Sequence, residues 1–321
     1  MLSIIVVSYN TESILKKALT KVFNQKEYGD FEVIVVDNAS SDDSCQMVTR
    51  DFPQVKLIQS PVNGGFAAGN NLGIRQAKGE YILLLNSDAY IFNDSLIESV
   101  AYMEDNPAVG IMGPQLVCED GSPQPSAHKF PSLYLKFRVL SGIESRRPSY
   151  ISYFDYFKAP DSVKPSPRKV DWVPGAYFMI RRELINQIGL LDDRFFMYYE
   201  EVDFCLRAKK AGWDVVFNPL ISIIHLGGQS SYATGKKVSR TGRQLVDIRV
   251  NSEYDYFRKH SGLAVELTAA LIEVGWKTLI WIKNNLLTDK DSAIKKDESK
   301  LAIGLVCKKI FREFAIQSKP A

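Results

Sequence analysis

The chain has 321 residues, which is enough for one large domain or two of ordinary size, each with a buried core. Its 40 Lys and Arg residues nearly balance its 37 Asp and Glu residues. This near equality argues against a nucleic-acid-binding protein, which would carry a clustered basic excess. The four cysteines lie far apart and the first apolar run is too short for a signal peptide or membrane span, so we expect a cytoplasmic protein.

Strand and helix patterns alternate along the first hundred residues. Continuous apolar runs predict buried strands at residues 3–10, 31–40, 55–60 and 81–88. Helical periodicity and N-cap residues predict helices at residues 12–25, 41–52 and 70–78. Buried strands separated by helices indicate a mostly parallel sheet covered on both faces, which is an α/β fold of the doubly wound type.

Polar residues follow three of these strands, at the edge where ligands bind in such sheets. They are Ser8, Tyr9 and Asn10 after the first strand, Asp37 and Asn38 after the second, and Asn86, Ser87 and Asp88 after the fourth. We expect the three strand ends to face one crevice. By itself, Asp88 fits a helix cap or a turn better than a ligand for a hard metal ion.

One histidine lies far downstream in a similar position. His225 ends the apolar run "ISIIH" and is followed by two glycines. Such a histidine is often structural, but beside a carboxylate it could bind a metal ion. Asp88 together with His225 would suit Mg²⁺ or Mn²⁺.

A cluster of acidic residues opens a predicted helix at residues 200–212. Asp203 and Arg207 have the i, i+4 spacing of an ion pair on one helix face. Glu200 and Glu201 fall in the first turn, where a carboxylate either stabilises the helix dipole or serves as a general base.

The remaining segments are less regular or more apolar. Residues 119–170 are rich in proline, show no clear periodicity beyond "LYLKFRVLSGI", and predict a loop excursion. Residues 170–189 predict a strand followed by a helix. Residues 261–321 predict apolar helices with a basic tail, since from residue 288 onward eight Lys and Arg face five Asp and Glu. These helices would pack on the domain or a second subunit, or dock to an anionic membrane.

Several motifs, in this order, resemble family 2 glycosyltransferases. They are "SIIVVSYN", "VIVVDNASSDDS", "NGGFAAGNNLGI", "YILLLNSDA", "VPGAYFMIRRELINQIGLLDDRFFMYYEEVDFCLRAKKAGW" and "HLGGQSS". The resemblance covers residues 1–260, implies the GT-A fold and an inverting reaction, and is nearest to bacterial dTDP-rhamnosyltransferases that build surface polysaccharides.

The resemblance also implies roles for individual residues. Asp88 corresponds to the last acid of the family's DxD motif and His225 to a later metal ligand, whereas Asn86 replaces the first acid. Glu201 occupies the position of the catalytic base, usually Asp, with Glu200 and Asp203 as alternatives. The nucleotide-sugar site would be lined by Ser8, Tyr9, Asn10, Asp37, Asn38, Gly65, Asn70, Asn71, Asn86, Ser87 and Asp88, and the donor and acceptor pocket by Trp172, Gly175 and Ala176.

The expected organisation is a catalytic domain at residues 1–260 and docking helices at residues 261–321. The catalytic domain would consist of a nucleotide-sugar half at 1–115, the excursion at 116–170 and an acceptor half at 171–260. The resemblance implies dTDP-rhamnose or a UDP-sugar as donor, a glycan or polyprenyl-diphosphate-linked acceptor, Mg²⁺ or Mn²⁺, and a peripheral position on the membrane, with a homo-oligomer left open. The alternatives are a sugar nucleotidyltransferase, which would carry a Gly-rich basic loop after the first strand, and an inactive glycan-binding scaffold.

Overall fold

The computed structural model describes residues 1–25, 30–92, 94–146, 166–227, 243–287 and 290–317. Within these ranges the chain divides into two compact units. The first unit comprises residues 1–130, 166–196 and 200–227, and the second comprises residues 131–146, 197–199, 243–287 and 290–317. The expected domain boundary at residue 260 therefore falls inside a helix of the second unit.

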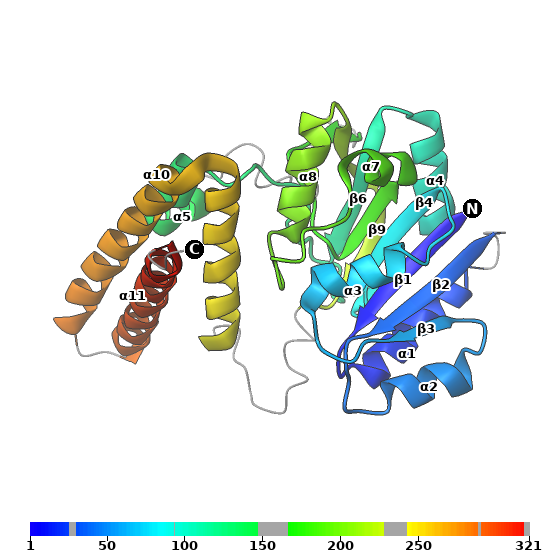
Figure 1. The fold of residues 1–321 in the computed structure, drawn as a ribbon, viewed down its shortest axis with the longest axis horizontal. Helices are drawn as coiled ribbons and strands as arrows, with labels where there is room; N and C mark the ends of the chain where they lie inside the picture. The colour runs from blue at the N-terminus through cyan, green and yellow to red at the C-terminus, as the bar shows by residue number, and fades with distance from the viewer. Residues whose placement is uncertain (26–29, 93, 147–165, 228–242, 288–289, 318–321) are drawn as a thin grey trace. The chain divides into compact units, whose positions relative to one another are not determined.

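The first unit is built on one mixed sheet, which has nine strands within the described ranges (Figure 1). The strands are β1 (Leu2–Ser8), β2 (Phe31–Asp37), β3 (Lys56–Gln59), β4 (Tyr81–Asn86), β5 (Ala89–Tyr90), β6 (Val109–Val117), β7 (Arg168–Lys169), β8 (Tyr177–Arg181) and β9 (Asp214–His225). Their order is β3-β2-β1-β4-β8-β6-β9-β5, with β7 also paired to β9. Strands β1 to β4 are parallel, as predicted, whereas β8 runs antiparallel between β4 and β6.

Helices cover both faces of this sheet. They are α1 (Glu12–Phe23), α2 (Ser44–Asp51), α3 (Gly65–Ile74), α4 (Ser95–Asp105), α7 (Arg182–Ile188) and α8 (Glu200–Lys210). Alternate residues of the central strands face opposite sides, so Ile4 and Val6 pack with α1, α2 and α4, while Ile5 packs with α3, α7 and α8. An apolar cluster on each face of the sheet therefore holds the strands, and with them the positions of their ends.

The predicted elements differ from the structure mainly at their ends. Helix α3 begins at Gly65 instead of residue 70, and β4 ends at Asn86, before Ser87 and Asp88. Within the predicted loop excursion at 119–170, the periodic stretch "LYLKFRVLSGI" is where helices occur, α5 (Leu133–Leu140) and the start of α6 (Ile143–Arg146). The apolar spacing of "LYLKFRVL" lets α5 pack in the second unit, and residues 147–165 lie outside the described ranges.

The second unit is helical. Helix α10 (Arg243–Asn285) bends at Gly262, whose φ of 83° is not helical, and α11 (Lys290–Gln317) follows it. The ammonium of Lys136 on α5 is buried and contacts Glu253 and Glu273, which lie on opposite sides of the bend in α10. A buried cation that bridges both arms fixes their mutual arrangement. No helix in the described ranges is long and apolar enough to cross a membrane.

Candidate active site

The ends of β1 and β2 place Ser8 and Asp37 side by side, because these residues are partners in the parallel register. Both are buried. The Oδ2 atom of Asp37 accepts the N–H of Ser40 at 3.0 Å, while its Oδ1 atom is buried and has no hydrogen-bond partner among the described residues. A buried carboxylate oxygen without a partner is costly, so this atom is suited to accept a donor group of a ligand.

The two turns that follow these strands are tightly tied to each other. The Oδ1 atom of Asn10 accepts the N–H of Ser41 at 2.7 Å, and the N–H of Asn10 donates to Ser40 Oγ at 2.9 Å. Asn10 has a φ of 53°, in the left-handed region that non-glycine residues seldom adopt. Tyr9, next to it, is half-buried. The polar residues predicted after β1 thus shape the rim around Asp37.

Asn38 links β2 to the start of α3. Its Nδ2 atom donates to Asn63 Oδ1 at 3.1 Å and to the carbonyl of Gly65 at 2.9 Å. Gly65 has a φ of 82°, and a Cβ atom placed there would lie 2.0 Å from the carbonyl oxygen of Phe196. The N–H of Phe66 donates to that same oxygen at 2.7 Å. Only glycine allows this approach of the loop 63–65 to Phe196.

The fourth strand end meets His225. Strand β5 pairs with β9 so that Ala89 lies opposite His225, and the N–H of Leu226 donates to the carbonyl of Asp88 at 3.0 Å. This pairing brings His225 Nε2 to 3.5 Å from Asp88 Oδ1, with side chains 16% and 4% exposed. The predicted proximity of these two residues is present in the structure. Ser87 is buried, and its Oγ atom has no hydrogen-bond partner among the described residues.

A residue that sequence reasoning missed lies behind His225. The Oε1 atom of Gln124 is 2.9 Å from His225 Nδ1, and its Nε2 atom donates to the His225 carbonyl at 2.6 Å. Gln124 lies in the proline-rich stretch, in which no local pattern marks a site residue. After β6 the chain turns back, so that Pro123 pairs with Val117, and this turn places Gln124 near β9, the neighbour of β6.

The segment that contains Trp172, Gly175 and Ala176 leads into β8. The N–H of Asn86 donates to the carbonyl of Ala176 at 3.0 Å, so this segment adjoins the end of β4. A Cβ atom on Gly175 would lie 4.0 Å from that of Glu201. The ring of Trp172 stacks on His128 with 4.1 Å between centroids, and its Nε1 donates to the carbonyl of Lys129. The segment therefore lies between the end of β4 and the start of α8.

The first turn of α8 carries two adjacent carboxyl groups in different environments. Glu200 is buried, whereas Glu201 is partly exposed. Burial, and then the negative charge of Glu201, raises the pKa of Glu200 well above its usual range. Tyr198 and Tyr199, directly before them, both have positive φ angles of 68° and 71°. Consecutive left-handed residues that are not glycine are strained, and such strain is found at functional sites.

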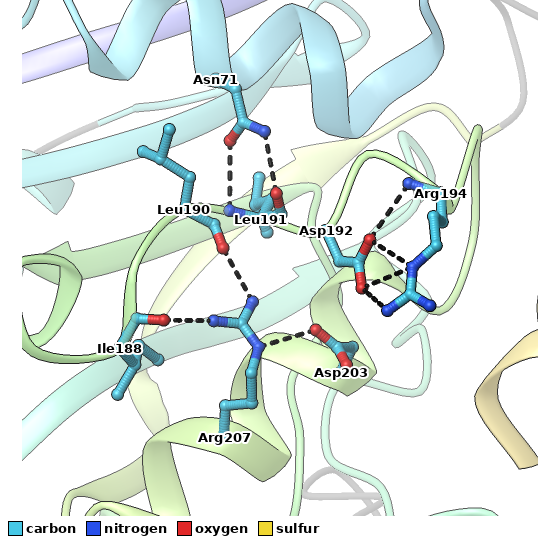
Figure 2. A network of polar contacts seen from close by, with 8 residues as sticks. All are labelled: Asn71, Ile188, Leu190, Leu191, Asp192, Arg194, Asp203 and Arg207. Carbon is cyan, nitrogen blue, oxygen red and sulfur yellow. Dashed lines mark hydrogen bonds and ion pairs between the residues drawn. The ribbon is translucent and has the colours of Figure 1, made fainter. Parts of the chain in front are cut away.

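Asp203 has a structural role. It is fully buried and its Oδ2 atom accepts from Arg207 Nε at 2.8 Å, while the same guanidinium donates to the carbonyls of Ile188 and Leu190 (Figure 2). This is the predicted i, i+4 ion pair, and it argues against Asp203 as a base.

Asn71 completes the same network from α3. It donates to the carbonyl of Leu191 at 2.8 Å and accepts its N–H at 3.1 Å (Figure 2). Asn70 also turns inward, since its amide donates to the carbonyl of Phe66 at 2.9 Å. That both residues line the nucleotide pocket stays a prediction. In the structure, Asn71 ties helix α3 to the loop before α8, and Asn70 bonds within α3.

Asp88 and His225 are the candidate donors for a cation among the predicted site residues. A carboxylate and an imidazole on adjoining strand ends match the ligand preferences of Mn²⁺ and, for the carboxylate, Mg²⁺. No group of three His, Cys, Asp or Glu residues that could hold a metal ion occurs in the described part of the chain. Two protein ligands leave coordination positions for phosphate oxygens and water, as is usual where a metal ion binds together with a phosphorylated substrate.

The fold and the site define a class: an α/β protein whose polar and acidic groups gather at the carboxyl ends of a mostly parallel sheet, with a carboxylate pair beside them. The model of the family described as "Glycosyl transferase family 2" matches residues 3–189, more than half of the chain. The chain belongs to this family, and it is a glycosyltransferase.

Individual relatives agree with this assignment. The N-acetylglucosaminyl-diphospho-decaprenol L-rhamnosyltransferase of Mycobacterium tuberculosis is 28% identical over 249 residues, covering 74% of this chain and 78% of the relative. Rhamnosyltransferase WbbL of Escherichia coli is 27% identical, covering 80% and 97%. The solved mannosyltransferase PcManGT from Pyrobaculum calidifontis, in complex with GDP-Man and Mn²⁺, has a TM-score of 0.55 at 17% identity over 97% of this chain and 87% of that one, which supports the GT-A fold.

Proposed function

We propose that this protein is an inverting glycosyltransferase that moves a sugar from a nucleotide-sugar, with dTDP-L-rhamnose as the first donor to test, to a lipid-linked glycan. The observation that carries the proposal is the meeting of Asp88 and His225 at the edge of the sheet that also holds Asp37. The names of the M. tuberculosis and E. coli relatives support rhamnose as the sugar. A UDP-hexose is the alternative donor.

The donor would occupy the strand ends in a defined direction. The buried Oδ1 atom of Asp37 would accept an N–H of the base or a ribose hydroxyl, while the diphosphate would reach Asp88. We assign Asp88 and His225 as the ligands of Mg²⁺ or Mn²⁺. When bound, that ion would neutralise charge on the departing diphosphate.

The reaction needs one base for the acceptor hydroxyl. We propose Glu201, the more exposed of the two carboxylates at the start of α8. It takes the hydroxyl proton as the oxygen bonds to the anomeric carbon, and the bond from that carbon to the diphosphate oxygen breaks on the opposite face. The nucleoside diphosphate leaves with the electron pair, so the configuration inverts and no second carboxylate is required.

Glu200 and Glu201 form a matched pair for the test. Glu201→Gln should lower kcat by about 10²–10⁴-fold because it removes the base. Glu200→Gln should leave kcat within about threefold, because the Glu200 side chain is buried and so is not placed to take a proton from an acceptor. The assay measures nucleoside diphosphate released from dTDP-rhamnose or UDP-hexoses with an acceptor and Mn²⁺.

Two results would contradict the proposal. Full activity in Glu201→Gln would place the base elsewhere. The second is absence of turnover with every donor, together with an affinity for nucleoside diphosphate that changes neither with Mn²⁺ nor in Asp88→Asn. That result would favour an inactive glycan-binding scaffold.

A lipid-linked acceptor requires the enzyme at the membrane, and the second unit offers a surface for this. One face of α10 after its bend is exposed at Ala264, Thr268, Leu271, Gly275, Leu279 and Ile282, and Leu286 continues it just beyond the helix. We name these residues the outward stripe. Its spacing of three and four residues is that of a continuous helical face.

The charges near the outward stripe favour an anionic surface. The acids of this arm, Glu266 and Glu273, are buried and face Arg258 and Lys136. Lys283 is exposed beside the stripe. An apolar stripe without exposed acid and with a flanking lysine is suited to lie on a bilayer with acidic lipids. We therefore propose a peripheral position on the membrane.

A further inference from the structure

We propose that Gln124 is a positioning residue that fixes which ring nitrogen of His225 faces Asp88. The inference about the imidazole rests on geometry alone, and its consequence for metal binding rests on the proposed function. Gln124 contacts both the ring and the backbone of His225, so it holds the imidazole from behind.

The orientation of the Gln124 amide follows from its surroundings. Its nitrogen lies 2.6 Å from the His225 carbonyl oxygen and 3.3 Å from Cys118 Sγ. An amide oxygen in that place would face another oxygen and repel it, so the amino group must point there. The amide oxygen is then the atom 2.9 Å from His225 Nδ1, and it can only accept.

The ring therefore carries its proton on Nδ1. A neutral imidazole has a single N–H group, so a proton held on Nδ1 leaves a lone pair on Nε2. That atom is the one directed at Asp88, 3.5 Å from Oδ1. Histidines that bind metal ions are usually oriented in this way by an acceptor on the far nitrogen.

Gln124 is itself held firmly. Its N–H donates to the carbonyl of Leu116 at 2.8 Å, and its carbonyl accepts from Gln115 Nε2 and Ser126 Oγ, both at 2.8 Å. Gln115 is completely buried. These contacts fix the backbone of Gln124 to β6, so the side chain has little freedom to release the ring.

The first test is the tautomer of His225, read by ¹⁵N NMR of the full chain labelled at its three histidines, without metal and at a pH where the ring is neutral. His225→Asn identifies the signal. The wild type should show the Nδ1–H tautomer. Gln124→Leu should shift His225 toward the Nε2–H form that free imidazole prefers in water, whereas Gln124→Glu should keep Nδ1–H because a carboxylate still accepts.

A matched control uses a second glutamine with the same kind of contact. Gln187 Oε1 on α7 accepts the ring N–H of Trp213 at 2.6 Å. Gln187→Leu removes one such hydrogen bond elsewhere in the first unit and should leave His225 unchanged. Thermal unfolding of each variant confirms that it is folded.

The second test is Mn²⁺ affinity, measured by electron paramagnetic resonance with dTDP and with UDP present. Gln124→Leu should bind Mn²⁺ about 10–100-fold more weakly, while Gln124→Glu and Gln187→Leu should stay near the wild type. An Nε2–H ring in the wild type, or an unchanged tautomer in Gln124→Leu, would overturn the inference even if affinity fell. A wild type that binds no Mn²⁺ would defeat the proposed function, and the NMR result would still decide the role of Gln124.

Discussion

Side chains that are neighbours in this site differ in what the sequence reveals of them. Asp88 and His225 could be singled out because each ends an apolar run, and strand ends converge in a parallel sheet. Gln124 could not, since its contact with His225 depends on the turn after β6 and not on any local pattern. The hydrogen bonds of Asn71 to Leu191 could not be predicted either. The sequence pattern is the same whether a helical amide binds a nucleotide or holds another segment of the chain.

His128 should make the stability of the first unit depend on pH. Burial lowers the pKa of His128 to about 4 beneath the ring of Trp172, below its usual value near 6.5. Between these values the unfolded chain binds the proton and the folded chain does not. Stability is therefore fully present above about pH 6.5 and is lost as the pH falls toward 4.

The measurement is chemical denaturation of wild type and His128→Phe at several pH values. The loss due to His128 should be about 1–2 kcal/mol, after allowance for its partial exposure. Phe keeps a ring against Trp172 but cannot be protonated, so this part of the slope should vanish. Parallel curves for the two proteins would show that His128 does not titrate in this way.

Helix α3 shows how a packing requirement overrides local propensity. Its sequence, "GFAAGNNLGI", contains three glycines, which disfavour a helix, and the predicted start at residue 70 is five residues too late. In the structure a Cβ atom at Gly69 or Gly73 would lie 2.8 or 2.5 Å from side chains of β1. The glycines let α3 approach the sheet closely, and this benefit cannot be read from the helix alone.

Gly65 and Gly121 separate backbone strain from steric conflict. Both have φ near +80°, but a Cβ atom at Gly121 would meet nothing within 4 Å, whereas at Gly65 it would strike the Phe196 carbonyl. Gly121→Ala should lower the free energy of unfolding by about 1–2 kcal/mol, the cost of the left-handed conformation. Gly65→Ala should cost more and should also weaken nucleotide binding.

Thermal unfolding and calorimetry with dTDP or UDP check this pair of variants. The weaker binding is expected because loop 63–65 is tied through Asn38 to the end of β2, beside Asp37. Equal destabilisation of the two variants would mean that the loop moves away from Phe196 at no cost.

Across the whole chain, the sequence was most informative where a pattern is local. The parallel strands β1 to β4 follow from their continuous apolar runs, but the antiparallel insertion of β8 does not, because direction is set by long connections. In the second unit, apolar periodicity predicted helices at residues 261–321, but not the part of α10 that precedes residue 261. It did not predict that Lys136 on a distant segment would neutralise Glu253 and Glu273 and so keep those acids inside.

Because the acids of α10 after its bend are buried, we expect the outward stripe to bind a membrane with anionic lipids. Wild type should float with vesicles that contain phosphatidylglycerol and much less with phosphatidylcholine alone, because the outward stripe supplies apolar area and Lys283 supplies charge. Replacing Leu271 and Leu279, which are 74% and 61% exposed, by Ser should abolish flotation, since each removes apolar area that would be buried at the membrane interface.

Leu220→Ser, at a residue 59% exposed on β9 of the first unit, is the matched control and should float as before. If the double variant still floats, or if it only converts a dimer to a monomer in analytical ultracentrifugation, the stripe binds a second copy or another surface and not the bilayer.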